Sequence, residues 1–561
     1  MSLQFITGNS GNGKTKYLFN RIVKEAKANP RDNYLVIVPE QFTMQTQRQL
    51  VDLSENKAIM NIDVLSFKRL AYRVFDELGI TNLTVLEETG KNLVLRKLAA
   101  QEADKLGVIG RNLNRIGYIS EVKSLLSELV QYNISPEELG RYIASGRLSD
   151  TLSDKLKDVL VLYEAFEKFM QDKYITAEEI LNVLCNVADE SAILRNSVIA
   201  FDEFTGFTPI QNQLIKKLFV ISKKIYVTLT IDCREDIFKS RGMQELFDMP
   251  KRTVKSLTEM AAFYGIEVEE PIILDKNYRL AENEELSFME QQLFRKRRHS
   301  FEKAPKHIHI DCLRDPKQEL TKIARRINEL VRNENLRYRD IAIVTGDVNI
   351  YAGYVREIFD KYNIPYFIDA TQEILFHPFI EFIRSIPDIA AQNFSADAVF
   401  RFLRCGFTEL SASEIDVLEN YVLACGVRGK SAWDKKWVRL PKHKAGYDIE
   451  LLNQSREYIM ELLKPVYQVF SDKKSTVKDY VLAIYKLIVL LDIPDKLAKK
   501  EQALLDAGDQ TASKEYGQIY KIVMQLFEKY VAVLGDECRG IYTDTGCRTG
   551  CGRCSSHTAG I

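Results

Sequence analysis

An octapeptide near the start of the chain has the residue types and spacing of a phosphate-binding loop. The pattern G-x-x-x-x-G-K-[ST] is matched by Gly8, Asn9, Ser10, Gly11, Asn12, Gly13, Lys14 and Thr15. The glycines let backbone N–H groups wrap a phosphate, Lys14 would reach the β- and γ-phosphates, and the Thr15 hydroxyl would hold Mg²⁺. An apolar run before the loop predicts a buried strand, and helical apolar spacing follows it. This context favours a nucleotide site over an accidental glycine-rich turn.

Two further segments contain side chains that could act on a bound nucleotide. Asp202 and Glu203 follow an apolar run; an acid there can hold Mg²⁺, and a second can orient or deprotonate the attacking water. Alone, the pair also fits a turn after a strand, but together with the loop it favours a metal site. In the segment 277–279, Tyr278 can stack on a purine and Arg279 can stabilise γ-phosphate charge. In isolation this string is weak, and an exposed polar turn would be the better interpretation.

The elements that must position these residues follow an α/β pattern. Apolar runs at 34–39, 62–65, 198–201 and 225–230 alternate with helical segments and predict a parallel, doubly wound sheet. Helical spacing over residues 83–195 predicts an all-helical insertion. A second set of strands is predicted at three places: 307–312, 340–345 and 365–369.

We therefore expect two RecA-like P-loop lobes, the second incomplete, each with an inserted helical subdomain. The first lobe would comprise residues 1–82 and 196–290, with the insertion at 83–195. The second lobe would span 300–390 and its helical insertion 391–537, leaving a cysteine-rich tail at 538–561. Between the two lobes, the basic run from Arg295 to Arg298 is interpreted as a solvated linker rather than a phosphate contact.

Composition limits the possible partners and location. Lys plus Arg and Asp plus Glu both number 78, so contact with nucleic acid must come from local patches or from a partner. No apolar stretch is long enough to span a membrane. The phosphate loop lies so close to the N-terminus that no signal peptide is expected, and five scattered cysteines are typical of reduced thiols. Together these features predict a cytoplasmic protein.

The order of the strings resembles that of UvrD-type superfamily 1 helicases. Their successive motifs are similar to the segments 64–71, 201–204, 231–242 and 277–279. A narrower likeness, to the AddB family, is carried by Val38-Pro39-Glu40-Gln41-Phe42-Thr43, by the segment 204–209 and by the segment 377–384. AddB proteins are the B subunits of the bacterial AddAB helicase–nuclease, which resects double-strand breaks. The likeness runs to about Glu537.

The resemblance implies a set of ligands and the residues that bind them. ATP would be held by residues 8–15 with Tyr278 and Arg279, Mg²⁺ by Thr15 and Asp202, and catalysis would involve Asp202 and Glu203. DNA contacts are implied at Phe42, Thr43, Ser66 and Phe67. The implied partners are single- and double-stranded DNA and an AddA-like motor subunit in a heterodimer. In this family AddB resembles a helicase repurposed to scan single strands for the recombination signal Chi.

Two departures from the helicase pattern bear on activity. Thr205 stands where the D-E-F-Q-D motif has its glutamine, and Glu235 stands where a glutamine follows the third motif. A carboxylate facing a γ-phosphate would repel it. The sequence therefore predicts ATP binding with weak or lost hydrolysis.

The end of the chain is foreign to the rest in composition. Cys538, Cys547, Cys551 and Cys554 have the spacing C-x₈-C-x₃-C-x₂-C, which could be a zinc or cluster site. Hydrophobic residues nearly vanish after Cys538, however, and a reading-frame shift near that codon is the favoured interpretation. The nuclease domain and the iron–sulfur ligands of AddB chains are not visible. A truncated second sheet would have an open edge, which predicts poor solubility.

Three functions remain in competition. The leading one is the ATP-binding, helicase-like N-terminal part of an AddB chain, truncated before its nuclease. A self-sufficient superfamily 1 DNA-dependent ATPase would turn over ATP alone, and a non-catalytic scaffold would keep the nucleotide only for folding. A small-molecule P-loop kinase is disfavoured because it needs neither the 277–279 string nor a second lobe.

Overall fold

A computed structural model describes most of the protein. The described residues are 1–80, 85–108, 110, 116–146, 148–170, 174–176, 178–295, 299–369, 374–440, 447–472 and 474–536. They form two compact units, which meet in the sequence between His307 and Ile308. The cysteine-rich tail predicted at 538–561 lies outside the described residues, as do 296–298 of the basic run.

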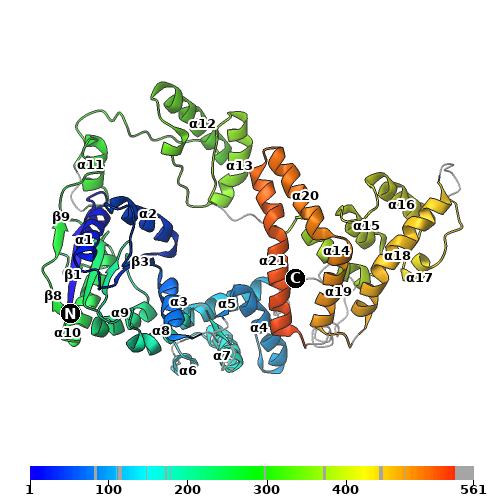
Figure 1. Ribbon diagram of the computed structural model, residues 1–561, viewed down its shortest axis with the longest axis horizontal. Coiled ribbons are helices and arrows are strands. Elements are labelled where there is room, and N and C mark those ends of the chain that lie inside the picture. The colour runs from blue at the N-terminus through cyan, green and yellow to red at the C-terminus, as the bar shows by residue number, and fades with distance from the viewer. Residues whose placement is uncertain are drawn as a thin grey trace. The chain divides into compact units, whose positions relative to one another are not determined.

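The first unit is built around one parallel sheet (Figure 1). Its strands are β1 (Ser2–Gly8), β2 (Tyr34–Ile37), β3 (Ile62–Leu65), β6 (Val198–Phe201), β7 (Lys224–Thr230), β8 (Glu267–Val268) and β9 (Ile272–Leu274). They lie in the order β3-β2-β6-β7-β1-β8, and β9 also pairs with β1. β1 and β7 pair in parallel from Ser2 opposite Lys224 to Gly8 opposite Thr230. The predicted α/β fold with a parallel sheet is confirmed.

Helices cover both faces of this sheet, which explains its nearly continuous apolar strands. Leu3 and Phe5 of β1 belong to the core on one face, whereas Ile6 belongs to the core on the other. The Ile6 face is covered by α1 (Lys14–Ala28) and α2 (Thr43–Leu53). The opposite face is covered by α3 (Phe67–Leu78), α8 (Ile180–Val187), α9 (Pro209–Ile221) and α10 (Asp248–Phe263).

A mainly helical insertion separates α3 from α8. Its helices are α4 (Glu88–Gln101), α5 (Ile116–Gln131), α6 (Pro136–Ala144) and α7 (Asp150–Met170). Two details correct the all-helical prediction for 83–195. The two-residue strands β4 (Val85–Leu86) and β5 (Ile175–Thr176) pair in parallel. Ile180 and Leu184 of α8 belong to the sheet's core, because this helix supplies one of the apolar faces that the strands need.

The elements of the second unit, in the part of it that the structure describes, are helices. Its helices are α12 (Pro316–Asn333), α13 (Val348–Lys361), α14 (Pro378–Ala391), α15 (Ala396–Arg404), α16 (Ala412–Cys425), α17 (Lys430–Asp434), α18 (Ile449–Ser471), α19 (Val477–Leu490), α20 (Ile493–Asp506) and α21 (Gln510–Leu534). The main core joins α14 to α21, and a smaller one joins α12 to α13. No described helix of the chain combines the length and apolar character needed to cross a bilayer.

The second set of predicted strands is absent from the described residues. None of the segments 307–312, 340–345 and 365–369 is a strand. Ile310, Val344 and Phe367 are 94%, 93% and 88% exposed, whereas a strand within a parallel sheet would bury such side chains. A strand needs partners distant in sequence, and here α12 and α13 pack on each other instead. A second RecA-like lobe is therefore not confirmed, and low solubility stays a prediction.

A histidine caps the first helix of the larger helical core. Nδ1 of His377 accepts a hydrogen bond from the Phe379 N–H at 3.1 Å. Its buried ring packs on Tyr516 of α21, with 4.4 Å between ring centroids. A ring nitrogen accepts a hydrogen bond only when it carries no proton, so the neutral form caps the helix. Burial lowers the pKa of His377 from its ordinary value of 6.5.

Acidification from about pH 7.5 to about pH 5.5 is therefore expected to destabilise the second unit through His377. In the unfolded chain this imidazole keeps its ordinary pKa, so below about pH 6.5 the unfolded state binds more protons and stability falls. His377→Asn keeps a capping side chain that does not titrate, and should reduce the loss by about 1 kcal/mol. Urea midpoints of both proteins at the two pH values measure this; equal losses would contradict it.

Candidate nucleotide site

The predicted phosphate loop connects β1 directly to α1. Gly11 and Gly13 have left-handed backbones, with φ of 89° and 80°. A Cβ atom on Gly11 would lie 2.7 Å from Asn277 Oδ1, so the close approach of the neighbouring segment also requires glycine here. The side chain of Asn12 donates a hydrogen bond to the Leu274 carbonyl at the end of β9. Contacts with the end of β9 and the segment after it therefore fix the conformation of the loop.

The segment 277–279 packs against this loop. The Tyr278 N–H donates to the Gly11 carbonyl at 3.0 Å, and the Asn277 side chain donates to the Ser10 carbonyl at 3.0 Å. Arg279 Nη1 lies 3.5 Å from Ser10 Oγ. The Tyr278 ring is exposed, with the Lys276 ammonium 5.0 Å from its centroid. Two distant strings of the sequence therefore form one surface.

A pocket of about 720 Å³ opens where the loop, the acids and this segment meet. Such an opening at the carboxyl ends of parallel strands is where ligands bind in α/β folds. The predicted residues that line it are Ser10, Gly11, Gly13, Lys14, Thr15, Asp202, Glu203, Tyr278 and Arg279. Gly8, Asn9 and Asn12 do not line it and instead support the loop.

Other lining residues escaped prediction. They are Lys16 and Phe19 of α1, Gln49, Asp52 and Leu53 of α2, Phe204 and Thr205 after β6, and Thr228 and Thr230 of β7. The D-E-F-Q-D-like motif already included Phe204 and pointed to Thr205, and the two threonines in an otherwise apolar strand were a signal for β7. The residues of α2 reach the pocket only because α2 packs beside α1, and no local pattern encodes that.

Oxygen donors suited to Mg²⁺ gather at one side of the pocket. Thr15 Oγ1 lies 3.3 Å from Asp202 Oδ1 and 3.3 Å from Glu203 Oε1. Asp202 is buried, and the Thr228 hydroxyl donates to its Oδ1. Its Oδ2 is buried with no hydrogen-bond partner among the described residues. Burial raises the pKa of Asp202 above its ordinary range. A hard cation would satisfy this oxygen and stabilise the ionised carboxylate, so the residues fit Mg²⁺.

Glu203 has an unusual backbone for a residue with a side chain. Its φ is 64°, in the left-handed region, and its side chain is exposed toward the pocket. Strained backbones of this kind concentrate at functional sites. Among the described residues, no cluster of three or more His, Cys, Asp or Glu side chains could hold a metal by itself. Phosphate oxygens and water would complete the coordination of a cation between Thr15 and Asp202.

Lys14 lies across the loop with its ammonium partly withdrawn from water. Lys14 Nζ donates to the Asn9 carbonyl at 3.0 Å. Burial lowers the pKa of Lys14, while Glu203 and Asp202 act in the opposite direction and Arg279 lowers it further. Lys14 and Arg279 therefore bring cationic side chains to the pocket that also contains the two acids.

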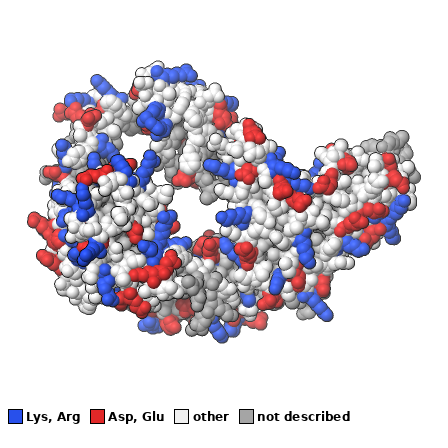
Figure 2. Space-filling view, in the orientation of Figure 1, with Lys and Arg blue, Asp and Glu red and all other residues white. Residues whose placement is uncertain are grey.

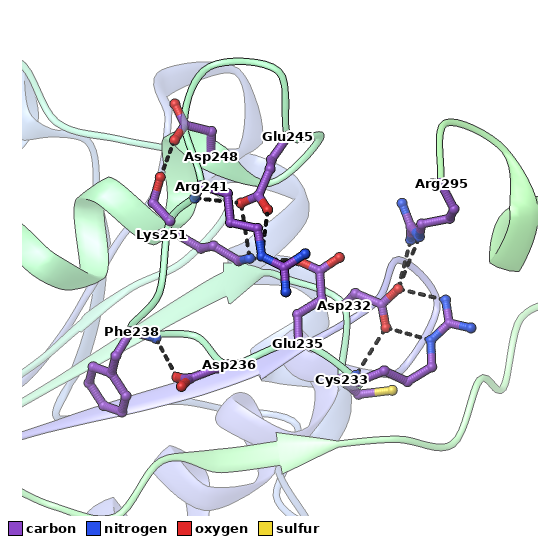
Figure 3. Close-up of polar contacts among 12 residues, drawn as sticks. Asp232, Cys233, Glu235, Asp236, Phe238, Arg241, Glu245, Asp248, Lys251 and Arg295 are labelled. Atoms are coloured by element: carbon purple, nitrogen blue, oxygen red, sulfur yellow. Dashed lines mark hydrogen bonds and ion pairs between the residues drawn. The ribbon is translucent and has the colours of Figure 1, made fainter. Parts of the chain in front are cut away.

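Glu235 does not line the pocket, contrary to the expectation that it faces a γ-phosphate. Its Oε2 lies 2.7 Å from Lys251 Nζ, which is 3.3 Å from Glu245 Oε2. Figure 3 shows Glu235, Glu245 and Lys251 together. Burial alone would lower the pKa of Lys251, but Glu235 and Glu245 outweigh it and raise the pKa. A buried cation therefore turns Glu235 into a structural ion-pair partner.

The four predicted DNA-contacting residues are largely inside the protein. Ser66 caps α3 by accepting from the Arg69 N–H, and Thr43 is buried. Phe42 packs against the core beneath α1 and α2. Phe67 packs its ring on Phe201, Phe204 and Phe207. Three of the four side chains, those of Thr43, Ser66 and Phe67, are therefore buried.

A second cleft, of about 320 Å³, is lined by two of these four residues, Ser66 and Phe67. Glu40, Ser66, Lys68 and Phe204 are among the residues that line it. Lys68 and the adjacent Arg69 are exposed in the first turn of α3. These two basic residues were not among the candidates predicted from the sequence, and DNA contact in this segment stays a prediction.

The glycine-rich loop lies between a buried strand, β1, and a helix, α1. It faces Asp202 at the end of β6, which β7 separates from β1 in the sheet. This arrangement defines the P-loop class of α/β folds. Within that class, a family model described as "ADDB, N-terminal" matches residues 5–290. The chain belongs to the AddB family.

Curated relatives extend this match along the chain. Proteins named as the B subunit of the ATP-dependent helicase/deoxyribonuclease, from Lachnoclostridium phytofermentans, Clostridium novyi and Clostridioides difficile, are 38%, 31% and 31% identical over 547, 543 and 551 residues. Each alignment covers 96% of this chain and 47% of the relative. The chain thus spans about half the length of the curated relatives it matches.

Proposed function

We propose that this chain is the ATP-binding, helicase-like N-terminal part of the AddB component of an AddAB-type helicase–nuclease. Such a complex would resect DNA ends in double-strand break repair and recombination. The observation that carries the proposal is the convergence of the loop, the acid pair and the segment 277–279 on one pocket. The names of the relatives, each the B subunit of an ATP-dependent helicase/deoxyribonuclease, support it.

The pocket residues divide the work of binding ATP. Backbone N–H groups of the loop and the Lys14 ammonium would bind the phosphates, and Tyr278 would stack on the adenine. Arg279 would contact the γ-phosphate. Thr15 and Asp202 would hold Mg²⁺, which neutralises phosphate charge when bound. Glu203 would orient or accept a proton from water near the γ-phosphate.

Binding with little hydrolysis is the favoured activity of this site. Glu235 is engaged by Lys251 and is not available as a γ-phosphate sensor. Thr205 replaces a glutamine at the pocket and has a shorter side chain with which to position water. Positioning and charge stabilisation supply most of the rate in phosphoryl transfer, so both changes would slow it.

DNA would bind at the second cleft. On the face shown in Figure 2, Lys and Arg are interspersed with Asp and Glu, so no broad basic area on that face suggests a path for DNA. Lys68, which lines the cleft, and the adjacent exposed Arg69 would therefore provide local phosphate contacts. We propose that a single strand scanned for Chi passes there, and that an AddA-like subunit supplies the motor.

Turnover measurements separate the three candidate functions. The AddB proposal expects ATP binding by the chain alone with little hydrolysis, whether or not single-stranded DNA is present. DNA-stimulated turnover by the chain alone, lost in Lys14→Ala, would instead support a self-sufficient ATPase. If Lys14→Ala leaves DNA processing by the reconstituted complex unchanged, the scaffold function is supported.

Asp202→Asn is expected to weaken Mg²⁺-dependent ATP binding by at least about tenfold, as losses at supporting residues of metal sites do. The amide keeps the size of the carboxylate but loses the charge that attracts the cation. Affinity without Mg²⁺ should change little. The control is Asp154→Asn on α7, where an exposed aspartate pairs with Lys157. Fluorescent ATP titrations with and without Mg²⁺ measure the affinity of each variant. An unchanged Mg²⁺ dependence in Asp202→Asn would rule out Asp202 as a ligand of Mg²⁺.

A further inference from the structure

The second residue of the phosphate loop uses both ends of its side-chain amide. Asn9 is buried, its Nδ2 donates to Glu290 Oε1 at 2.7 Å, and its Oδ1 accepts from the Cys233 N–H at 2.9 Å. Glu290 lies on α11 (Glu284–Gln292), and Cys233 follows β7. A carboxylate only accepts and an N–H only donates, so the amide orientation is unambiguous. Aspartate could keep one contact but would repel Glu290.

The two partners of Asn9 are themselves connected. Asp232, adjacent to Cys233, is buried and accepts from Arg295 Nε at 3.1 Å. Arg295 Nη2 lies 2.9 Å from Asp232 Oδ2 and 4.0 Å from Glu290 Oε1. Figure 3 shows Asp232, Cys233 and Arg295 together. Asn9, Cys233, Asp232, Arg295 and Glu290 therefore form a closed ring of contacts, which we call the Asn9 ring.

The Asn9 ring is fixed in place by a second arginine and an aromatic side chain. Arg234 makes a bidentate contact with Asp232, and the Arg295 guanidinium lies 4.9 Å from the Phe247 ring centroid. Asp232, at the centre of these contacts, is buried and bonded to both arginines, which leaves it few alternative arrangements. The ring is therefore a firm support for whatever is attached to it.

The same asparagine also contacts the phosphate-binding lysine. Its carbonyl accepts from Lys14 Nζ at 3.0 Å, while its side chain belongs to the ring. A phosphate that binds the Lys14 ammonium would weaken its hydrogen bond to the Asn9 carbonyl. If Asn9 then moved, its contacts with Glu290 and Cys233 would be strained. The segment 284–295, which carries Glu290 and Arg295, is the last helical segment before the first unit ends at His307.

We propose that Asn9 is a positioning residue that couples the conformation of the phosphate loop to the segment 284–295. The loop is held ready for phosphate by Glu290 and Arg295, which do not line the pocket, and nucleotide binding in turn orders that segment. Thermodynamic linkage requires the two effects to be reciprocal. The nucleotide part of this inference rests on the proposed function.

Variants on α11 provide a matched test. Glu290→Gln weakens the acceptor of Asn9, whereas Glu284→Gln, on the same helix, changes only an exposed ion pair with Lys303. Titration of an ATP analogue with Mg²⁺ should show losses of about tenfold for Asn9→Ala and for Glu290→Gln, and none for Glu284→Gln. The double variant should bind about as well as Asn9→Ala, because Asn9→Ala already removes the contact with Glu290 that Glu290→Gln weakens. Unchanged affinity in both single variants, or losses that multiply, would overturn the proposal.

Hydrogen exchange separates coupling from a merely structural contact, because only coupling makes nucleotide binding protect residues 284–295. Saturating nucleotide should slow amide exchange in residues 284–295 of the wild type but not of Asn9→Ala at equal occupancy. Without nucleotide, Glu290→Gln should already speed exchange in the loop, residues 8–15, whereas Glu284→Gln should not. If the wild type binds no nucleotide but Glu290→Gln loosens the loop, the proposed function fails and the positioning role stands. Unaltered loop exchange in Glu290→Gln contradicts the role whether or not nucleotide binds.

Discussion

Lys14→Ala is expected to weaken ATP binding by about 100-fold, the loss that follows when a charged hydrogen bond and a net positive charge are removed from a phosphate site. The side chain lies across the loop beside the Asn9 carbonyl, and Arg279 is the other predicted cationic contact in the pocket. Arg279 cannot substitute for it, because its guanidinium approaches from the segment 277–279. Titration with a fluorescent ATP analogue, monitored by anisotropy, measures the change.

The control for Lys14→Ala removes the same charge from the same helix. Lys24 is exposed on α1 and does not line the pocket, so Lys24→Ala should bind the analogue as the wild type does. Both variants should keep the wild-type melting temperature within a few degrees, since neither lysine is part of a core. A folded Lys14→Ala protein whose affinity is close to that of the wild type would exclude this loop as the phosphate site.

Lys251→Met is expected to have the largest effect on stability. The Lys251 side chain is 3% exposed and is the cation shared by Glu235 and Glu245. Methionine fits the space but leaves the carboxylates without that cation, and breaking a buried pair on one side costs about 3 kcal/mol or more. Urea unfolding, followed by a signal from the first unit, should show the corresponding fall in midpoint.

A lysine on the same helix provides the control for Lys251→Met. Lys255 is 68% exposed and lies 3.9 Å from Glu259, so Lys255→Met should change the free energy of unfolding by about 0.5 kcal/mol or less. Adding Glu235→Gln to Lys251→Met should recover part of the loss, because one unpaired charge is removed with it. If Lys251→Met and Lys255→Met are equally stable, the buried ion pair does not support the segment after β7.

Local chemistry explains which parts of the fold and the site were predictable. The loop was recognisable because phosphate binding needs glycines, a lysine and a hydroxyl at fixed spacing, and Gly11 and Gly13 do have the backbones that only glycine adopts easily. The parallel sheet followed from apolar runs that stay apolar on both faces, as in β2 and β6. The 277–279 string gained meaning only from its resemblance to a family motif.

What could not be predicted depends on partners distant in sequence. Ile310, Val344 and Phe367 lie in runs with strand-like composition, but a run becomes a strand only when a neighbouring strand pairs with it. A resemblance implied DNA contact at Phe67, which stays a prediction, but the packing of its ring on Phe201 could not be read from the motif. No spacing rule indicated that Asn9 would contact Glu290, because the tertiary fold determines which groups lie next to a buried amide.

The central claim is that the triphosphate of ATP binds at residues 8–15, and calorimetric titration of the folded wild-type chain tests it most directly. The titrant is a non-hydrolysable ATP analogue with Mg²⁺. The account predicts a saturable isotherm with one site per chain, which weakens when Mg²⁺ is removed. A flat titration of cooperatively melting protein, at concentrations where P-loop proteins bind nucleotide, would contradict it.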